Sequence, residues 1–247
     1  MSAPGTRPAG VEGDQEISRF VRRMFDGVAP RYDLLNHVLS FNTDRYWRWR
    51  TVRKLRPVLD KPGARAVDLC CGSGDLLIAL QGRTPATVFG SDFSHQMLRA
   101  CDAKIAAGRL PAKVFESDAM QLPLAAGSLD LVTCAFGFRN LVNYRAGLAE
   151  ILRVLKPGGT AAILEFSTPP NALFRRFYEF YSLRVLPRIA GMISGVPEAY
   201  EYLPESVRKF PGAPELAEAM RGVGFGDVEF TRMTFGIVAL HIGRKRA

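Results

Sequence analysis

Two acidic residues flank a glycine-rich segment with a spacing that suits an adenosine-containing ligand. Asp68 lies in a short apolar run that leads into Gly72, Ser73 and Gly74 and then a helical pattern, and Asp92 stands eighteen residues beyond Gly74. Glycines let the backbone approach a ligand closely, and a helix N-terminus offers unpaired N–H groups. An acid at the end of the next strand can accept hydrogen bonds from both ribose hydroxyls. The segment therefore predicts a nucleoside-type site.

The same segment argues against two other ligand classes. A dinucleotide fingerprint needs a third glycine where this chain has Leu77, and the phosphate-binding pattern G-x-x-x-x-G-K-[ST] is missing from the sequence. An acid before the glycines and a second acid after the next strand resemble the class I S-adenosylmethionine-dependent methyltransferases. The usual pattern of that class is D-x-G-x-G-x-G, and Cys70 replaces its first glycine.

This resemblance implies roles for the candidate residues. Asp68 helps to hold the amino-acid end of S-adenosylmethionine, the glycine loop lies under the body of the cofactor, and Asp92 binds the ribose. Further along the chain, Asp118 and Ala119 match the pair that edges the adenine, and Ala135 lies beside the cofactor at the end of a later strand. The alternative for Asp118 is a helix cap or a turn residue.

Three longer motifs resemble the ubiquinone/menaquinone biosynthesis C-methyltransferase family. Residues 32–47 read Y-D-x-x-N-x-x-x-S-x-x-x-D-x-x-W, residues 136–140 read F-G-F-R-N, and residues 153–159 read R-V-L-K-P-G-G, followed by I-L-E-F-S at 163–167. The lysine-proline-glycine-glycine turn is common to many class I methyltransferases, whereas the first two motifs are specific. The similarity extends from about Phe25 to Lys245.

The resemblance implies C-methylation of a polyprenylated quinol, with S-adenosylmethionine as the methyl donor and no metal. Demethylmenaquinol is the substrate that we favour, and a 2-polyprenyl-6-methoxy-1,4-benzoquinol of ubiquinone biosynthesis stays open. The ring carbon beside a phenolic oxygen is nucleophilic in the reduced ring only. Ionising a phenol of pKa about 10 at pH 7 costs roughly 4 kcal/mol, so the site must assist that ionisation.

Four polar residues are candidates to act on the ring. We expect Arg139 to hold the phenolate or to orient a water that takes its proton, because a guanidinium stays charged, and we expect Asn140 to bond a ring oxygen. The alternative for Arg139 is a salt bridge that fixes its loop. Tyr32 and Asn36 are candidate substrate-binding residues, with a core tyrosine and a helix cap as the alternatives.

Short apolar runs alternate with helical segments between residues 64 and 166, which predicts an α/β fold. We expect strands near 64–69, 87–91, 112–116, 129–134 and 159–166, with helices near 75–81, 94–107 and 144–155. A helix near 213–222 and two strands near 227–234 and 237–244 follow. The expected fold is therefore a Rossmann-like, mostly parallel, seven-stranded sheet of the class I methyltransferase type with an antiparallel C-terminal hairpin.

Two segments lie outside this alternation, within a single methyltransferase domain at 16–247. Residues 16–57 are helical in period with a break at Pro30, and residues 171–210 form an aromatic and basic helical insert interrupted by Pro187, Pro197 and Pro204. We expect both segments to cover the substrate pocket as a lid. Residues 1–15 are rich in glycine, proline and alanine and are expected to be a flexible N-terminus.

The positive charge of the chain suggests an anionic partner, which could be nucleic acid, an anionic membrane surface or an acidic substrate. The 247 residues carry 33 Lys+Arg and 24 Asp+Glu, a formal net charge of +9, and the basic residues are dense within Arg45–Arg56 and the insert. A lipid substrate favours an anionic membrane surface over nucleic acid, although a nucleic-acid methyltransferase is the rival class. The four cysteines lack metal-like spacing. We expect a cytoplasmic protein attached peripherally to the inner face of the membrane, and a homo-oligomer stays open.

Overall fold

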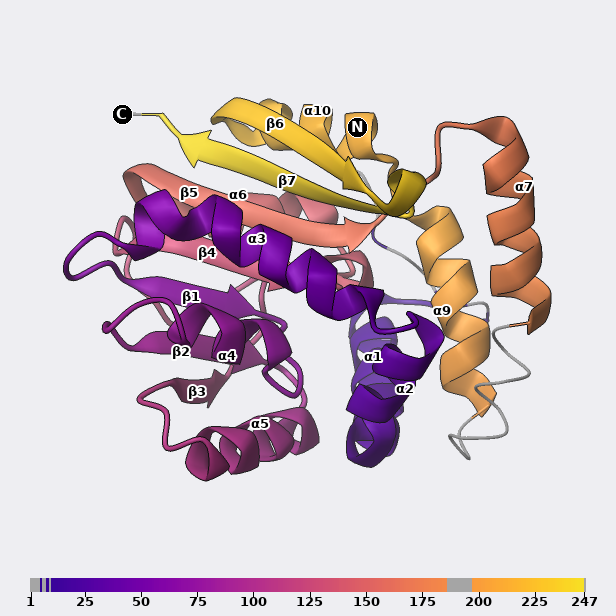
Figure 1. Ribbon diagram of the computed structural model, residues 1–247, viewed down its shortest axis with the longest axis horizontal. Helices are drawn as coiled ribbons and strands as arrows, with labels where there is room; N and C mark the ends of the chain where they lie inside the picture. Colours follow the sequence, from indigo (N-terminus) through magenta and orange to yellow (C-terminus); the bar gives the residue numbers. More distant parts are fainter. Residues whose placement is uncertain (1–4, 6–7, 9, 186–196, 247) are drawn as a thin grey trace.

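Seven strands form one twisted sheet in the order β3-β2-β1-β4-β5-β7-β6 (Figure 1). The computed structural model describes residues 5, 8, 10–185 and 197–246. All neighbours from β3 to β5 are parallel, and β7 runs antiparallel to both β5 and β6. This confirms the predicted mostly parallel sheet with its C-terminal hairpin. The strands are β1 (Ala66–Leu69), β2 (Val88–Asp92), β3 (Lys113–Glu116), β4 (Leu129–Ala135), β5 (Leu155–Phe166), β6 (Phe225–Met233) and β7 (Val238–Lys245).

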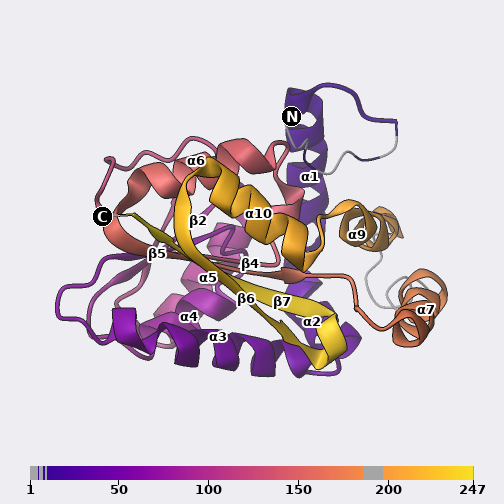
Figure 2. The same ribbon diagram turned by 90° about the horizontal axis from the view of Figure 1, so that it is seen from above.

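Helices cover both faces of the sheet, as the view from above shows (Figure 2). One apolar cluster joins one face to α3, α4 and α5, and a second cluster joins the opposite face to α6 and α10. Strands buried on both faces explain the continuous apolar runs in the sequence. These helices are α3 (Thr43–Leu59), α4 (Asp75–Gln81), α5 (His95–Ala107), α6 (Tyr144–Val154) and α10 (Ala213–Val223).

The N-terminal segment breaks at the predicted proline. Helix α1 (Asp14–Val28) ends at a 3-10 turn, η1 (Ala29–Arg31), and α2 (Tyr32–Leu39) follows it. Helix α1 already begins at Asp14, within the segment expected to be flexible, and residues 1–4, 6–7 and 9 lie outside the described residues.

Helix α3 joins the N-terminal segment to the C-terminal hairpin. Its buried side includes Trp47, whose indole Nε1 donates a hydrogen bond to Thr234 Oγ1 at 2.8 Å. Thr234 begins the turn between β6 and β7, η4 (Thr234–Gly236). The Trp47 ring also packs against Phe136 and Phe166, which stand at the ends of β4 and β5. The basic residues of α3 are therefore mostly on its outer side, whereas its aromatic inner side reaches the carboxyl edge of the sheet.

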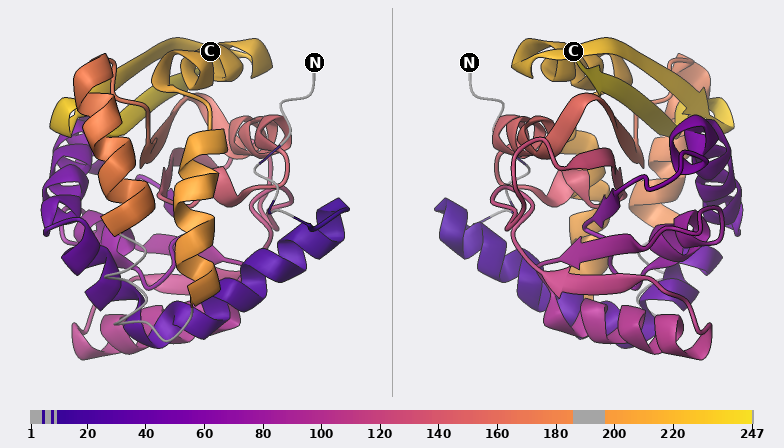
Figure 3. Two further views of the ribbon diagram at one scale, coloured as in Figure 1. Left: turned by 90° about the vertical axis from the view of Figure 1, so that its right-hand side faces the viewer. Right: turned by 90° about the vertical axis from the view of Figure 1, so that its left-hand side faces the viewer.

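The insert forms two helical segments at that edge of the molecule (Figure 3, left). Helix α7 (Ala172–Phe180) continues into a π-helical turn, η3 (Tyr181–Val185), and α9 (Pro197–Lys209) follows. The expected break at Pro204 is wrong, because this residue lies inside α9, and Pro187 lies outside the described residues. No helix in the described part of the chain is long and apolar enough to cross a bilayer.

Candidate active site

Two cavities of about 720 Å³ each open at the carboxyl edge of the parallel strands. We call them the Asp92 cavity and the Arg139 cavity, after the residues that distinguish them. Ligands of open α/β sheets bind at this edge, where loops rather than helices meet the strand ends. The two cavities share one wall, so ligands in the two cavities would lie next to each other. The wall consists of Phe25, Tyr32, Cys70, Gly72 and Phe136.

The glycine loop connects β1 to α4 through left-handed backbone conformations. Gly72 and Gly74 have φ values of 55° and 90°, which glycine adopts without strain. Gly74 also caps α4, and a Cβ there would lie 2.4 Å from the sulfur of Cys101. Cys70, at the position of the first family glycine, has φ 51°. The chain thus keeps the turn of the motif with a strained non-glycine residue in it.

Asp92 is oriented by the glycine loop itself. Its carboxylate accepts hydrogen bonds from the backbone N–H groups of Gly72 and Ser94, both at 2.9 Å. Burial raises the pKa of this carboxyl, and the hydrogen bonds from Ser94 and Gly72 oppose that rise. Asp92 lines the cavity, and its carboxylate can accept further hydrogen bonds there, as binding of ribose hydroxyls requires.

Asp68 lies on the other side of the shared wall. It is 1% exposed, lines the Arg139 cavity and accepts a hydrogen bond from Thr133 Oγ1 at 2.6 Å. Burial raises the pKa of this carboxyl to about 7, against the hydrogen bond from Thr133, which lowers it. A buried carboxylate with few partners is suited to a cationic group of a ligand.

The other predicted cofactor residues divide between the two cavities. Asp118 and Ala119 line the Asp92 cavity, although Asp118 also accepts a hydrogen bond from the N–H of Met120, as a turn residue would. Ser73 and Ala135 line the Arg139 cavity. Gly74 lines neither cavity and acts as the cap of α4. An elongated ligand fits this division, with a nucleoside at Asp92 and Asp118 and an amino-acid end at Asp68 and Ser73.

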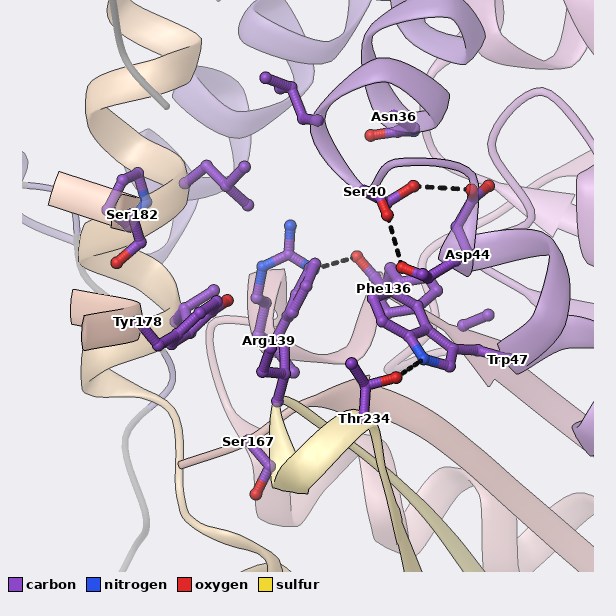
Figure 4. A pocket seen from close by; sticks show the side chains of 18 of the residues that line it. Asn36, Ser40, Asp44, Trp47, Phe136, Arg139, Ser167, Tyr178, Ser182 and Thr234 are labelled. Carbon is purple, nitrogen blue, oxygen red and sulfur yellow. Dashed lines mark hydrogen bonds between the residues drawn. The ribbon is translucent and has the colours of Figure 1, made fainter. Parts of the chain in front are cut away.

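Arg139 is fixed in the middle of its cavity (Figure 4). It belongs to a 3-10 turn after β4, η2 (Phe138–Asn140), and is 5% exposed. Its Nη1 donates to Glu165 Oε1 at 3.0 Å and to the carbonyl of Phe136, and its Nε donates to Ser206 Oγ at 3.3 Å. The guanidinium also stands over the ring of Phe166, 5.4 Å from its centroid. Nη2 has no hydrogen-bond partner among the described residues.

Glu165 is the partner that the sequence analysis did not assign. It is the penultimate residue of β5, is 1% exposed, and accepts hydrogen bonds from the N–H groups of Phe166 at 2.8 Å and Arg139 at 3.2 Å. Burial lowers the pKa of the Arg139 guanidinium, but Glu165, Tyr32 and Tyr202 together outweigh burial and raise this pKa. The structure confirms the salt bridge that was the alternative for Arg139, and the side chain also lines the cavity, so its role toward a phenolate stays a prediction.

Tyr32 and Asn36 come from α2 and line the Arg139 cavity together. Burial raises the pKa of the Tyr32 hydroxyl, and Arg139 and a hydrogen bond with Asn36 oppose that rise. Asn140 lies elsewhere than expected: it lines the Asp92 cavity, and its Oδ1 accepts a hydrogen bond from the hydroxyl of Tyr202 at 3.1 Å. The structure thus brings Arg139, Tyr32 and Asn36 together and places Asn140 behind the shared wall.

Two tyrosines of the insert also reach the Arg139 cavity. Tyr178 of α7 points toward Arg139 in Figure 4, and Tyr202 of α9 lines the cavity from another side. Burial raises the pKa of Tyr178 to about 12, and Arg139 opposes that rise. The helical spacing of aromatic residues in the insert was the available signal for them. Sequence alone does not show which stripe of the helix faces the cavity.

A buried ion-pair network attaches α3 to the first turn of α4. Arg48 Nη2 donates to Asp44 Oδ2 at 2.6 Å and to Asp75 Oδ2 at 2.5 Å, and Asp75 is also paired with Lys104 at 2.8 Å. The ligand atoms of His37, Asp44 and Asp75 are close enough for a shared metal ion. Arg48 already supplies a cation to both carboxylates. The network therefore positions α3 against α4. The spacing of the N-terminal motif alone does not reveal this role.

The sheet order, the glycine loop and the two spaced acids define an S-adenosylmethionine-dependent methyltransferase of class I. The chain belongs to the ubiE/COQ5 methyltransferase family, whose family model matches residues 12–245. This confirms the predicted family and the predicted enzyme class.

Relatives and solved structures agree with this assignment. The demethylmenaquinone methyltransferase of Deinococcus radiodurans is 43% identical over 247 residues, with full coverage of both chains. That of Thermus thermophilus is 46% identical and covers 89% of this chain and 99% of its own. A Geobacter sulfurreducens protein named ubiquinone/menaquinone biosynthesis C-methyltransferase UbiE is 45% identical over 91% of this chain and 88% of its own.

Solved structures with low sequence identity share the fold. The Haemonchus contortus phosphoethanolamine N-methyltransferase 2, in complex with S-adenosyl-L-methionine, has a TM-score of 0.69 and 15% identity over 98% of this chain and 62% of its own. The [4+2]-cyclase SpnF has a TM-score of 0.67 and 16% identity, with 99% of both chains covered. Proteins with the same fold thus catalyse different reactions, so the chemistry of the Arg139 cavity has to be inferred from the residues that line it.

The raised pKa of Asp68 predicts a pH-dependent cofactor affinity. If its carboxylate holds the cationic amino-acid end, binding needs the ionised form, which grows from about a tenth to about nine tenths between pH 6 and pH 8 for a pKa near 7. Titration calorimetry with S-adenosylhomocysteine should therefore show roughly tenfold tighter binding at pH 8 than at pH 6. Asp68→Asn should bind weakly with a flat profile. An equal pH slope in both proteins would contradict this role.

Proposed function

We propose that the enzyme methylates a ring carbon of demethylmenaquinol with S-adenosylmethionine to give menaquinol. The observation that carries this proposal is the free edge of Arg139, held in a mostly apolar cavity that shares five lining residues with the cavity of Asp92. The names of the full-length relatives support the substrate. The cavity suits a flat aromatic ring, because Trp47, Phe136 and Phe166 form one side of it.

When bound, S-adenosylmethionine supplies a methyl group on a positively charged sulfur. Asp92 and Asp118 would hold the nucleoside, and Asp68 would hold the amino-acid end. The ring would lie in the Arg139 cavity, next to the residues that both cavities share. Holding both reactants at neighbouring sites would favour methyl transfer between them.

Arg139 assists the ionisation of the quinol. Nη2 is free to donate to the phenolic oxygen, and a positive charge within about 4–6 Å lowers the pKa of such a group by roughly 1–3 units. That covers a large part of the roughly 4 kcal/mol needed at pH 7. Glu165 balances the charge of the empty site and fixes the guanidinium plane. The phenolic proton leaves directly to water or through a water that Arg139 orients.

A benzoquinol of ubiquinone biosynthesis is the second candidate substrate. The relative from Geobacter sulfurreducens carries both quinones in its name. Both rings present a carbon beside a phenolic oxygen, so the chemistry at Arg139 would be the same. The two full-length or nearly full-length relatives named for demethylmenaquinone favour the naphthoquinol.

Incubation with methyl-labelled S-adenosylmethionine and short-chain reduced rings tests this function. We expect the mass of a demethylnaphthoquinol to increase by one methyl group, faster than that of the matching benzoquinol, and we expect no methylation of either oxidised quinone. The oxidised rings serve as the control, because their ring carbon is electrophilic. A protein that methylates neither reduced ring would refute the proposal.

We further propose that the enzyme takes its lipid substrate from an anionic membrane surface. Five exposed apolar side chains surround the mouth of the Arg139 cavity, and we call them the rim patch. They are Phe41, Leu173, Phe177, Phe180 and Phe235, between 61% and 80% exposed.

Neighbouring contacts place the rim patch at the cavity mouth. Phe41 and Phe177 also line the cavity, and Phe235 packs on Phe174, another lining residue, with ring centroids 5.1 Å apart. Leu173, Phe177 and Phe180 follow one stripe of α7. Arg176 and Arg184 are exposed nearby in the same insert. An apolar rim with basic neighbours is typical of a surface that enters the headgroup region of an anionic bilayer.

Sedimentation with anionic vesicles tests the rim patch. Leu173→Ser with Phe180→Ser removes two rim side chains that do not line the cavity, and should weaken vesicle binding by at least about tenfold, given about 1.5–3 kcal/mol per buried side chain. Tyr46→Ser with Trp49→Ser on the outer side of α3 is the matched control and should bind vesicles as the wild type does. Retention on RNA in place of vesicles at low salt would contradict the membrane proposal.

A further inference from the structure

Helix α9 contacts the two polar residues of η2, which lie on opposite sides of the shared wall. The Tyr202 hydroxyl donates to Asn140 Oδ1 at 3.1 Å, and Ser206 Oγ accepts from Arg139 Nε at 3.3 Å. Asn140 lines the Asp92 cavity, whereas Arg139 lines its own cavity. One helix of the insert is therefore bonded to a residue of each binding site.

Tyr202 also joins α9 to the helix that covers the Asp92 cavity. It is 4% exposed, and its ring meets that of Phe20 in α1 edge to face, with centroids 6.2 Å apart. It shares an apolar cluster with Ile17 and Val21 of the same helix. Helix α1 in turn lines the Asp92 cavity through Ser18, Arg19 and Arg22.

Five described residues of α9 line the Arg139 cavity, and none of them lines the Asp92 cavity. These five are Tyr202, Leu203, Pro204, Val207 and Arg208. A ligand confined to the Asp92 cavity, such as the nucleoside part of the cofactor, would therefore reach the described α9 residues through intermediates, and Tyr202 is in contact with two of them, α1 and Asn140. This geometry makes Tyr202 a physical link between the two sites.

We propose that Tyr202 couples the two cavities, so that the nucleoside part of the cofactor, in the Asp92 cavity, orders α9 over the Arg139 cavity. A ligand that fixes α1 and Asn140 also fixes the ring and the hydroxyl of Tyr202. The quinol then binds a cavity in which α9 is already ordered, so the protein loses less conformational entropy when the quinol binds. Such coupling is reciprocal, so the quinol strengthens cofactor binding by the same factor. The quinol part rests on the proposed function, whereas the ordering of α9 does not.

Hydrogen exchange of the backbone amides of α9 tests the coupling without any quinol. Adenosine, which lacks the amino-acid end expected at Asp68 and Ser73, should slow exchange across residues 201–209 several-fold in the wild type, although none of the described α9 residues lines the Asp92 cavity. Tyr202→Phe keeps the ring and removes the hydroxyl, and should lose most of that protection while α1 remains protected. Tyr181→Phe is the matched control, because the Tyr181 hydroxyl donates to the Leu39 carbonyl at 3.3 Å and bonds no other described residue. This variant should keep the protection of the α9 amides.

A second readout is the affinity of a reduced naphthoquinol with and without adenosine, which occupies the Asp92 cavity alone. The ratio of the two dissociation constants should be roughly ten in the wild type and near one in Tyr202→Phe. Tyr181→Phe should change both dissociation constants by the same factor, so their ratio should stay at the wild-type value.

The two readouts separate the possible failures. Unprotected α9 amides in the wild type, or full protection in Tyr202→Phe, would overturn the coupling whatever the substrate is. Protected amides in a wild type that binds no quinol would leave the coupling standing and overturn the proposed function instead.

Discussion

The buried ion pair between Arg139 and Glu165 is the interaction on which the rest of the site depends. Burying two charges costs several kcal/mol, which good geometry and further hydrogen bonds must offset. Here the guanidinium also bonds the Phe136 carbonyl and Ser206, and the carboxylate also bonds two backbone N–H groups. Nε and Nη1 donate these hydrogen bonds, whereas Nη2 has no partner among the described residues and can donate to a ligand. The pair thus fixes a single free edge of one cation in an apolar cavity.

The parallel sheet is what brings this pair together. Ala135 and Leu164 are register partners on β4 and β5, so η2 and Glu165 emerge side by side although they are far apart in sequence. Trp47 of α3 then closes one side by packing on the aromatic rings that follow each strand. The same edge holds the glycine loop of β1. The Asp92 and Arg139 cavities are therefore adjacent because the strands that lead to them are adjacent.

Much of the fold could be predicted from the sequence, because local patterns specify it. Apolar runs gave the strands to within a few residues, although β5 starts at Leu155, before its lysine-proline-glycine-glycine turn. Arg139, Tyr32 and Asn36 were predicted in one cavity, and the structure places them there. The pairing with Glu165, the position of Asn140 and the cover that α1 forms over the nucleoside site could not be predicted. They depend on strand register and helix packing across the chain, which local spacing does not encode.

The central claim is that the free edge of Arg139 lowers the pKa of a phenol in its cavity. A 1-naphthol with an alkoxy group at position 4 has one ionisable hydroxyl, and its absorbance can be titrated in the enzyme saturated with S-adenosylhomocysteine. The account predicts that its pKa falls by about 1–3 units in the wild type and in Arg175→Gln, which changes another arginine of the same cavity, but not in Arg139→Gln. An unshifted pKa in the wild type, or an equal shift in Arg139→Gln, would contradict it.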